Sequence, residues 1–209
     1  MLAQRLAPPV LRGLFLDFSS PPLLTDEEFL SIIIVMQEEI IKLIRKYRSN
    51  LAPMSVLDLG CGRGGNTIAL AKEGAKVLAV DRNPEMLKHT VSLAHKESVF
   101  ILFQEGSAVD FSSPHHYDVV LFTNVLHFIP EKNQKKALEN ILDNLVSPGT
   151  VFVFSDLIDD GEVPEGFKEM IRKRLANVVE VYKTLDDSPH KGVPYPHTHL
   201  IYFIAGIGQ

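Results

Sequence analysis

The sequence has little that would crosslink the chain or anchor it in a membrane. Its 209 residues include one cysteine and no tryptophan, which excludes a disulfide framework and a cysteine-cluster metal site and favours a reducing compartment. The longest fully apolar run near the start, Ile32–Met36, is far too short to span a bilayer. A net charge of −5 gives no general attraction for nucleic acid or an anionic membrane.

The chain otherwise has an ordinary globular balance, with 45% hydrophobic and 22% charged residues. This composition is sufficient to bury a core and argues against disorder. We therefore expect one cytoplasmic domain with a small extension, monomeric or homodimeric, without nucleic-acid or membrane partners. The arginine-containing, acid-poor start faintly resembles a transit peptide, but Pro8 and Pro9 would interrupt the helix that such a peptide needs.

The first 50 residues are predicted to form an arm followed by one helix. Four prolines within residues 1–24 indicate an irregular arm. Thr25 and Glu28 have the spacing of a capping box, and a basic stretch precedes Pro53, so a helix is predicted over about 25–48. The arm is a candidate active-site lid because it carries Leu14, Phe15, Leu16 and Phe18; packing against the sheet is the alternative. Residues 51–209 form the predicted main domain.

From residue 55 onward, short apolar runs alternate with helical patterns. The predicted strands are 56–59, 76–80, 99–104, 118–123, 150–155, 178–185 and 199–207, and the predicted helices are 65–73, 84–96, 131–145 and 165–176. Such alternation is typical of βαβ units in a doubly wound α/β fold with a mostly parallel sheet. The proline-rich loop between the last two strands favours an antiparallel hairpin at the sheet edge.

A glycine motif lies between the first predicted strand and helix. Gly60, Gly62 and Gly65 satisfy G-x-G-x-x-G, and the motif ends a strand and opens a helix. Asp81 ends the next predicted strand, 21 positions after Gly60, where an acid can bind a ribose diol. The order of these features predicts an adenosine-containing ligand; a glycine turn that serves packing alone is the alternative.

Asp58 helps to distinguish between adenosine ligands. A dinucleotide places its pyrophosphate at the helix N-terminus, and a carboxylate two residues before Gly60 would add negative charge there. That charge suits a ligand with a cationic amino group or sulfonium, so S-adenosylmethionine is favoured over NAD. A nicotinamide-dependent oxidoreductase and a non-catalytic cofactor-binding protein remain the alternatives.

Four stretches of the sequence together resemble the class I S-adenosylmethionine-dependent methyltransferases. Residues 56–64 resemble the first motif of that family, 77–87 its second-strand acid and following helix, 117–128 its fourth strand, and 145–154 the turn into its fifth strand. The resemblance covers about residues 54–156 and implies a seven-stranded Rossmann-like fold. More loosely, Asn66 and the segment 197–201 resemble small-molecule methyltransferases of the tellurite-resistance type.

The resemblance also implies residue roles. Gly60 and Gly62 would line the homocysteine and ribose of the cofactor, Asp58 would face its amino group, and Asp81 would bind the ribose hydroxyls. The other implied cofactor contacts are Cys61, Asn66, Arg82, Met86, Gly106, Ser107, Ala108 and Asn124. Ser107 stands where the family usually has an aspartate. Its neutral hydrogen bond to adenine would contribute about 1 kcal/mol, against roughly 1.5–3 for a charged acceptor; Asp110 is a candidate substitute.

The same reasoning predicts methyl transfer to a small-molecule acceptor by in-line displacement. His127, just beyond the fourth strand, is the candidate general base for a thiol or hydroxyl, with helix packing as the alternative. Asp156, at the end of the fifth strand, is a second polar candidate. His190, His197 and His199 could in principle share a divalent metal, but no carboxylate is near them in sequence and no metal site is predicted.

Overall fold

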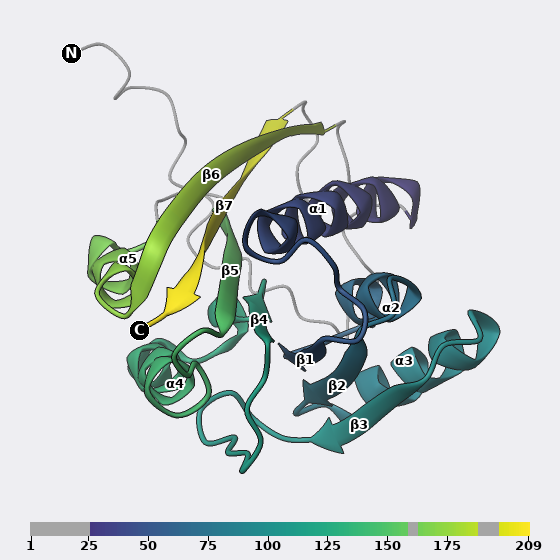
Figure 1. Cartoon of the computed structure of the whole chain (residues 1–209). Coiled ribbons are helices and arrows are strands. Elements are labelled where there is room, and N and C mark those ends of the chain that lie inside the picture. The colour runs from purple at the N-terminus through teal and green to yellow at the C-terminus, as the bar shows by residue number, and fades with distance from the viewer. Residues whose placement is uncertain (1–25, 159–162, 188–196) are drawn as a thin grey trace.

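The computed structural model describes residues 26–158, 163–187 and 197–209 (Figure 1). The predicted lid at residues 1–24 lies outside this part of the chain. The elements in chain order are α1 Asp26–Tyr47, β1 Ser55–Leu59, α2 Gly65–Lys72, β2 Lys76–Asp81, α3 Pro84–Lys96, β3 Ile101–Glu105, β4 Val119–Thr123, the 3₁₀ turn η1 Leu126–Phe128, α4 Glu131–Asn144, β5 Val151–Ile158, α5 Glu165–Arg172, β6 Leu175–Asp187 and β7 His197–Gly208.

One seven-stranded sheet organises these elements, in the order β3-β2-β1-β4-β5-β7-β6. The strands from β3 to β5 are parallel, and β7 runs antiparallel to both β5 and β6. The chain winds from β1 toward β3 and then returns to β4 on the other side of β1. The winding therefore reverses between β1 and β4, and in open α/β sheets ligands bind at the carboxyl ends of the strands at such a point. The predicted doubly wound sheet and antiparallel edge pair are confirmed.

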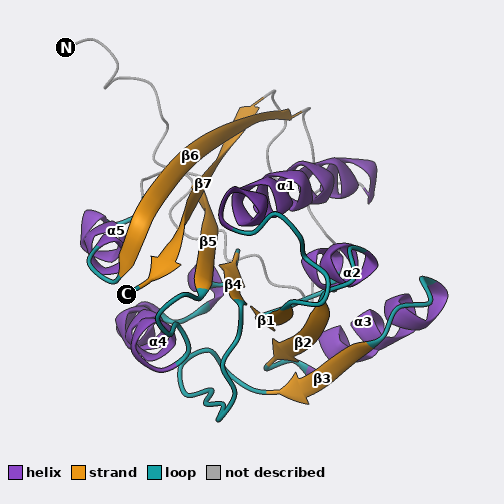
Figure 2. Cartoon of the chain, in the orientation of Figure 1, coloured by secondary structure: helices purple, strands orange, loops and turns teal. Residues whose placement is uncertain are grey.

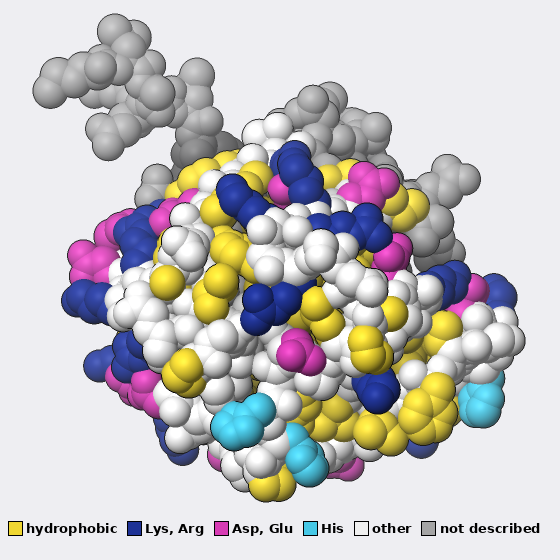
Figure 3. Space-filling view, in the orientation of Figure 1, with side chains coloured by type: hydrophobic (Ala, Val, Ile, Leu, Met, Phe, Trp, Pro, Cys, Tyr) yellow, Lys and Arg dark blue, Asp and Glu magenta, His cyan; other side chains and the backbone are white. Residues whose placement is uncertain are grey.

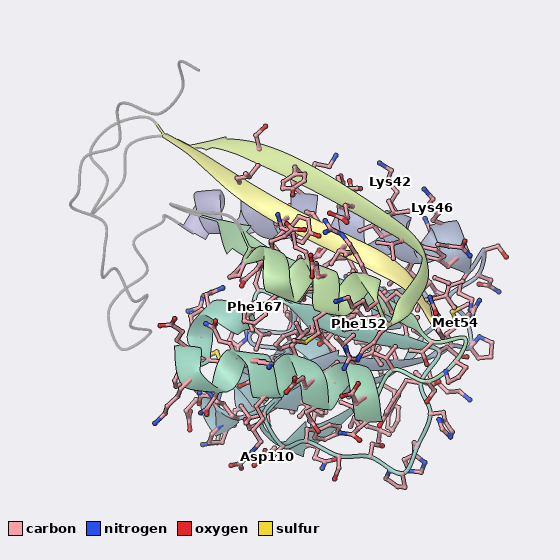
Figure 4. The ribbon with its side chains drawn as sticks, turned by 90° about the vertical axis from the view of Figure 1, so that its left-hand side faces the viewer. Lys42, Lys46, Met54, Asp110, Phe152 and Phe167 are labelled. Carbon is pink, nitrogen blue, oxygen red and sulfur yellow. The ribbon has the colours of Figure 1, made fainter. Side chains whose placement is uncertain are left out.

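Helices cover both faces of the sheet, with α1, α2 and α3 on one face and α4 and α5 on the other (Figure 2). The strands are consequently apolar on both sides, and every residue of β4 is buried. Phe152 and Phe154 of β5 point toward α4 and α5, whereas the alternate residues Val151 and Val153 belong to the core under α1. Figure 4 views the molecule from the side of α4 and α5, with Phe152 behind them.

Most predicted boundaries agree with the structure, but the region before β6 does not. The helix predicted over 165–176 ends at Arg172. Leu175 and Ala176 instead pair with Gly208 and Ile207 of β7. This pairing supplies hydrogen-bond partners for backbone groups of β7, which would lose them if the helix continued to residue 176. The register shifts between Ala176 and Val179, and Asn177 takes a positive φ of 53° there. The strand predicted over 99–104 begins at Ile101, and the 3₁₀ turn η1 was not predicted.

The charged side chains on the surface are mixed in sign (Figure 3). The basic run at the end of α5 is an example. Arg172 contacts Glu165 and Glu180, Lys173 lies 3.7 Å from Glu169, and Arg174 lies 2.6 Å from Asp143. The run therefore forms ion pairs with its own chain. Within the residues described, no helix has the length and apolar content needed to span a membrane.

Candidate cofactor and acceptor site

The glycine loop between β1 and α2 is held against the end of β2. Gly60, Gly62 and Gly64 all have positive φ values, of 85°, 53° and 83°, which L-residues rarely adopt. The backbone N–H groups of Gly60 and Cys61 both donate to the carbonyl of Val80, at 2.7 and 3.0 Å, and that of Gly64 donates to Cys61 at 2.9 Å. These N–H groups are therefore already bound, two by the end of β2 and one within the loop.

Asp81 binds the next N–H group of the loop. Its Oδ2 accepts a hydrogen bond from the backbone of Gly62 at 2.8 Å, and its Oδ1 accepts one from the backbone of Asn83 at 2.8 Å. The side chain of Asn83 caps α3 by accepting from the N–H of Glu85 at 3.0 Å. A carboxylate has about four lone-pair sites, so these two bonds leave acceptor capacity for the hydroxyls of a ribose diol.

Asp58 lies on β1 with its side chain against the first turn of α2, and it is only 2% exposed. Its Oδ2 accepts a 2.5 Å hydrogen bond from the hydroxyl of Thr67, and the backbone N–H of Thr67 also binds the carboxylate. Burial raises the pKa of Asp58 from 3.8 to about 6; the bonds to Thr67 act in the opposite direction, and the charge of Asp81 adds to the rise. Sequence reasoning missed Thr67, although its place two residues into the helix was a signal.

This arrangement is unsuited to a diphosphate. A helix N-terminus binds phosphate through free N–H groups and the positive end of its dipole. Here Asp58 occupies that position, Asp81 binds Gly62, and the other loop N–H groups described above are bound to carbonyls. Two carboxylates beside the loop attract a cation instead. The residues present therefore fit the sulfonium and ammonium groups of S-adenosylmethionine, with Asp81 left to hold the ribose.

The three left-handed glycines serve different purposes. A Cβ atom on Gly60 would overlap the side chain of Val125, and one on Gly64 would overlap Thr90. Both glycines are thus required by packing within the protein. A Cβ on Gly62 would meet nothing within 4 Å, so the loop is open on that side. Gly62 is the position at which a ligand can approach the backbone.

The predicted adenine-side residues lie beyond β2 and β3. Arg82 is exposed and donates from Nη2 to the carbonyl of Phe128 at 3.1 Å, and Met86 is half-buried. The Oγ of Ser107 accepts from the N–H of Val109 at 3.3 Å. A Cβ at Gly106 would press on Phe111 and Val80, so Gly106 also has a packing role.

Three other residues predicted to contact the cofactor pack against or form hydrogen bonds with other parts of the chain. Cys61 is 8% exposed, and burial followed by the charges of Asp58 and Asp81 raises its thiol pKa, which suits a packing role. Ala108 is buried in the core on the α4 side. Asn66 donates to Thr123 at 3.0 Å.

Asn124 follows β4 in a left-handed conformation with φ of 54°. It donates to the sulfur of Met36 on α1 at 2.9 Å, and its buried Oδ1 has no hydrogen-bond partner among the described residues. An orphaned acceptor at the carboxyl end of β4 is a group that a bound ammonium could satisfy.

The structure brings together His127 and Asp156, which the sequence suggested separately. Nδ1 of His127, in η1, forms a hydrogen bond with Oδ1 of Asp156 on β5. The His127 side chain is 28% exposed and that of Asp156 is 8% exposed. The disfavoured alternative of a histidine metal site is not tested, because His190 and the side chains of His197 and His199 lie outside the described part of the structure. In the described part of the chain, no group of three or more potential metal ligands occurs.

Comparison with known proteins agrees with this geometry. Residues 56–149 match the methyltransferase domain family. "Ubiquinone biosynthesis O-methyltransferase" of Methylococcus capsulatus is 30% identical over 111 residues, which cover 52% of this chain and 46% of the relative. The protein of the same name from Nitrosospira multiformis is 33% identical over 87 residues, which cover 40% of this chain and 36% of the relative. The chain therefore spans about half or less of the length of these curated relatives.

Solved structures show the same fold at low identity. The PH0226 protein from Pyrococcus horikoshii OT3 has a TM-score of 0.65 and 17% identity, with 94% of this chain and 100% of that chain covered. TehB from Haemophilus influenzae has a TM-score of 0.60 and 20% identity, with 75% and 58% covered. The N-methyltransferase NodS from Bradyrhizobium japonicum WM9, in complex with S-adenosyl-L-homocysteine, has a TM-score of 0.57 and 20% identity, with 81% and 86% covered. Residues 56–149 thus match the methyltransferase domain family, and the described part of the chain has the fold of these solved structures.

Proposed function

We propose that this protein transfers a methyl group from S-adenosylmethionine to a small-molecule acceptor. The observation that carries the proposal is the occupation of the glycine loop by the protein's own carboxylates. Asp58 is bound at the start of α2 and Asp81 binds Gly62, so the site offers negative charge where a dinucleotide would bring a diphosphate.

Each part of the site has a distinct task in this proposal. Asp81 binds the ribose hydroxyls, Gly62 lets the cofactor approach the backbone, and Asp58 acts on the cofactor through its charge. The cofactor supplies an activated methyl group on a cationic sulfur. Since that group is already reactive, the protein has mainly to position the acceptor in line and exclude water, which can contribute roughly 7–11 kcal/mol in favourable cases.

The acceptor side is formed by the ends of β4 and β5. His127 and Asp156 lie there, and the ring of Phe128 is 4.0 Å from that of His127 between centroids. A small acceptor is favoured because the described residues outside the matched domain form helices α1 and α5 and strands β5, β6 and β7 of the same sheet, and not a separate recognition domain. The curated relatives are named O-methyltransferases, which is consistent with an oxygen acceptor. The cytoplasmic location, the monomeric or homodimeric state and the lid role of residues 1–24 stay predictions.

Calorimetric titration of the full chain tests the proposal. S-adenosylhomocysteine should bind with measurable heat, and NAD should not bind. Asp143→Asn, which removes an exposed carboxylate paired with Arg174, controls for general charge effects. Binding to Asp110→Asn, which removes an exposed carboxylate after β3, tests whether Asp110 substitutes for Ser107 at the adenine. Binding of NAD in preference to S-adenosylhomocysteine would defeat the proposal and favour an oxidoreductase.

A further inference from the structure

The pair formed by His127 and Asp156 has the arrangement of a proton acceptor with its orienting group. Asp156 lies on a strand in the sheet, and its side chain is 8% exposed; that of His127, in the turn after β4, is 28% exposed. Asp156 binds Nδ1 of the ring. Within the described chain no hydrogen-bond partner is found for Nε2 of His127. One ring nitrogen is thus held by the protein, and the other remains for a ligand.

A carboxylate on one ring nitrogen decides which tautomer the imidazole adopts. A carboxylate only accepts hydrogen bonds, so a neutral His127 must carry its proton on Nδ1. Nε2 then has a free lone pair and can take a proton from a bound molecule. The negative charge of Asp156 also stabilises the imidazolium that forms, as the aspartate does in a catalytic triad.

We propose that Asp156 is a positioning residue that holds His127 as the proton acceptor for a hydroxyl group on the methyl acceptor. This inference rests on the proposed methyltransferase function and narrows its substrate class. An acceptor that is already ionised, such as a metalloid oxyanion, has no proton for Nε2 to remove. A thiol, with an ordinary pKa of about 8.5, is already a few per cent ionised at pH 7, whereas a phenolic hydroxyl, with a pKa of about 10, is about thirtyfold less ionised and depends more on a base. A protonated amine would bring a second positive charge beside the sulfonium.

The surroundings of the pair suit an acceptor with an aromatic or other apolar skeleton. Phe128 lies against His127, and Tyr202 of β7 is directly opposite Asp156 in the sheet register. The ring of Tyr202 lies 5.1 Å from that of Tyr182 on β6 and 6.4 Å from that of Phe154 on β5. The side chain of Asp156 is itself 8% exposed, and an ionic contact is stronger in such a low-dielectric setting.

The step balances without a further reactant. The acceptor hydroxyl gives its proton to Nε2 of His127 while its oxygen forms a bond to the methyl carbon. The carbon–sulfur bond breaks, and its electron pair remains on sulfur, which becomes neutral. The products are a methyl ether and S-adenosylhomocysteine, and the imidazolium of His127 later releases its proton to water.

The tautomer of His127 tests the positioning role without any substrate. In ¹⁵N spectra of the labelled full chain, at a pH where the ring is neutral, Nδ1 should be protonated and Nε2 bare; the His127→Gln spectrum assigns the signals. In Asp156→Asn the side-chain amide can donate to Nδ1, so the proton should move to Nε2. Asp143→Asn, an exposed aspartate paired with Arg174, should change nothing. A wild-type ring protonated at Nε2, or the same tautomer in Asp156→Asn, would overturn the inference.

A second measurement tests the acceptor class. Release of S-adenosylhomocysteine is followed with phenol and catechol as hydroxyl probes, and with 2-mercaptoethanol, benzylamine and selenite as the alternatives. The hydroxyl probes should react, and Asp156→Asn should slow them by at least about a hundredfold while the Kd for S-adenosylhomocysteine changes less than about twofold. No release from either hydroxyl probe overturns the assignment. Failure to bind S-adenosylhomocysteine would instead defeat the proposed function, so the two failures are distinguishable.

Discussion

The carboxylate of Asp81 accepts a 2.8 Å hydrogen bond from the backbone N–H of Gly62. This bond joins the end of β2 to the loop that follows β1. Asp81 and Gly62, which are far apart in the sequence, are therefore in contact at the carboxyl ends of these two strands. The bond also occupies an N–H group that a dinucleotide-binding loop would direct at phosphate. The proposed role of the loop in binding a cation depends on this contact and on Asp58.

Replacement of Asp81 should weaken cofactor binding more than it weakens the fold. In Asp81→Asn, one oxygen remains to accept from the backbone, but the charged acceptor for the ribose hydroxyls is lost. We expect the Kd for S-adenosylhomocysteine to rise at least about tenfold, which corresponds to about 1.4 kcal/mol. Calorimetry gives the Kd, and Glu105→Gln, an exposed carboxyl at the end of the neighbouring strand β3, is the control. An unchanged Kd would mean that Asp81 does not contact the cofactor.

The buried Asp58 should make stability depend on pH. Its pKa is about 6 in the folded protein and 3.8 as its ordinary value, so the folded state binds its proton more tightly than the unfolded state. The resulting stabilisation is complete below about pH 4 and is lost as the pH rises to about 6, by roughly 3 kcal/mol in total. Urea unfolding across this range should show the decline.

Asp58→Asn is the matching variant for that measurement. It cannot ionise, so its free energy of unfolding should lack the Asp58 contribution between pH 4 and 6. It should also bind S-adenosylhomocysteine more weakly, because the charge beside the loop is gone. A pH profile identical to that of the wild-type protein would show that Asp58 ionises normally and is not held in a dry site.

Gly62 and Gly64 should respond differently to the same substitution. In either position alanine must adopt a left-handed conformation, at a cost of about 1–2 kcal/mol. At Gly64 the new methyl group also overlaps Thr90, whereas at Gly62 it enters open space. We expect Gly64→Ala to lower the melting temperature more, and Gly62→Ala to weaken S-adenosylhomocysteine binding at least about tenfold. Tight binding by Gly62→Ala would show that the open side of the loop does not face the cofactor.

Substitution of His127 should affect turnover and leave cofactor affinity nearly intact. A general base contributes about a hundredfold to ten-thousandfold, so His127→Gln should slow S-adenosylhomocysteine release from a hydroxyl probe within that range. His116→Gln removes a ring that is exposed and bound to Ser147 at 2.8 Å, and it should retain normal turnover. Equal rates in the two variants, with stability lost only in His127→Gln, would support the packing interpretation.

Local sequence patterns were sufficient for most of the architecture. Apolar runs separated by helical periods predicted each strand, because strands covered by helices on both faces must be apolar on both faces. The helix predicted over 84–96 agrees with α3, and the structure adds the Asn83 side chain as its N-terminal cap. The exception was Leu175 and Ala176, whose strand conformation depends on pairing with β7. Such pairing joins residues far apart in the chain and leaves no local signal.

By itself, the sequence determined the order of the elements, the glycine loop and the acids at the ends of the first two strands, since these depend on neighbouring residues. Only the tertiary structure decided how those groups are used. The contact of Asp81 with Gly62, the burial of Asp58 against Thr67 and the pairing of His127 with Asp156 each join separate elements. The sheet brings those elements together at the carboxyl ends of its strands, because parallel strands end on the same side. Distances between residues of different strands at that side are not encoded in any single segment.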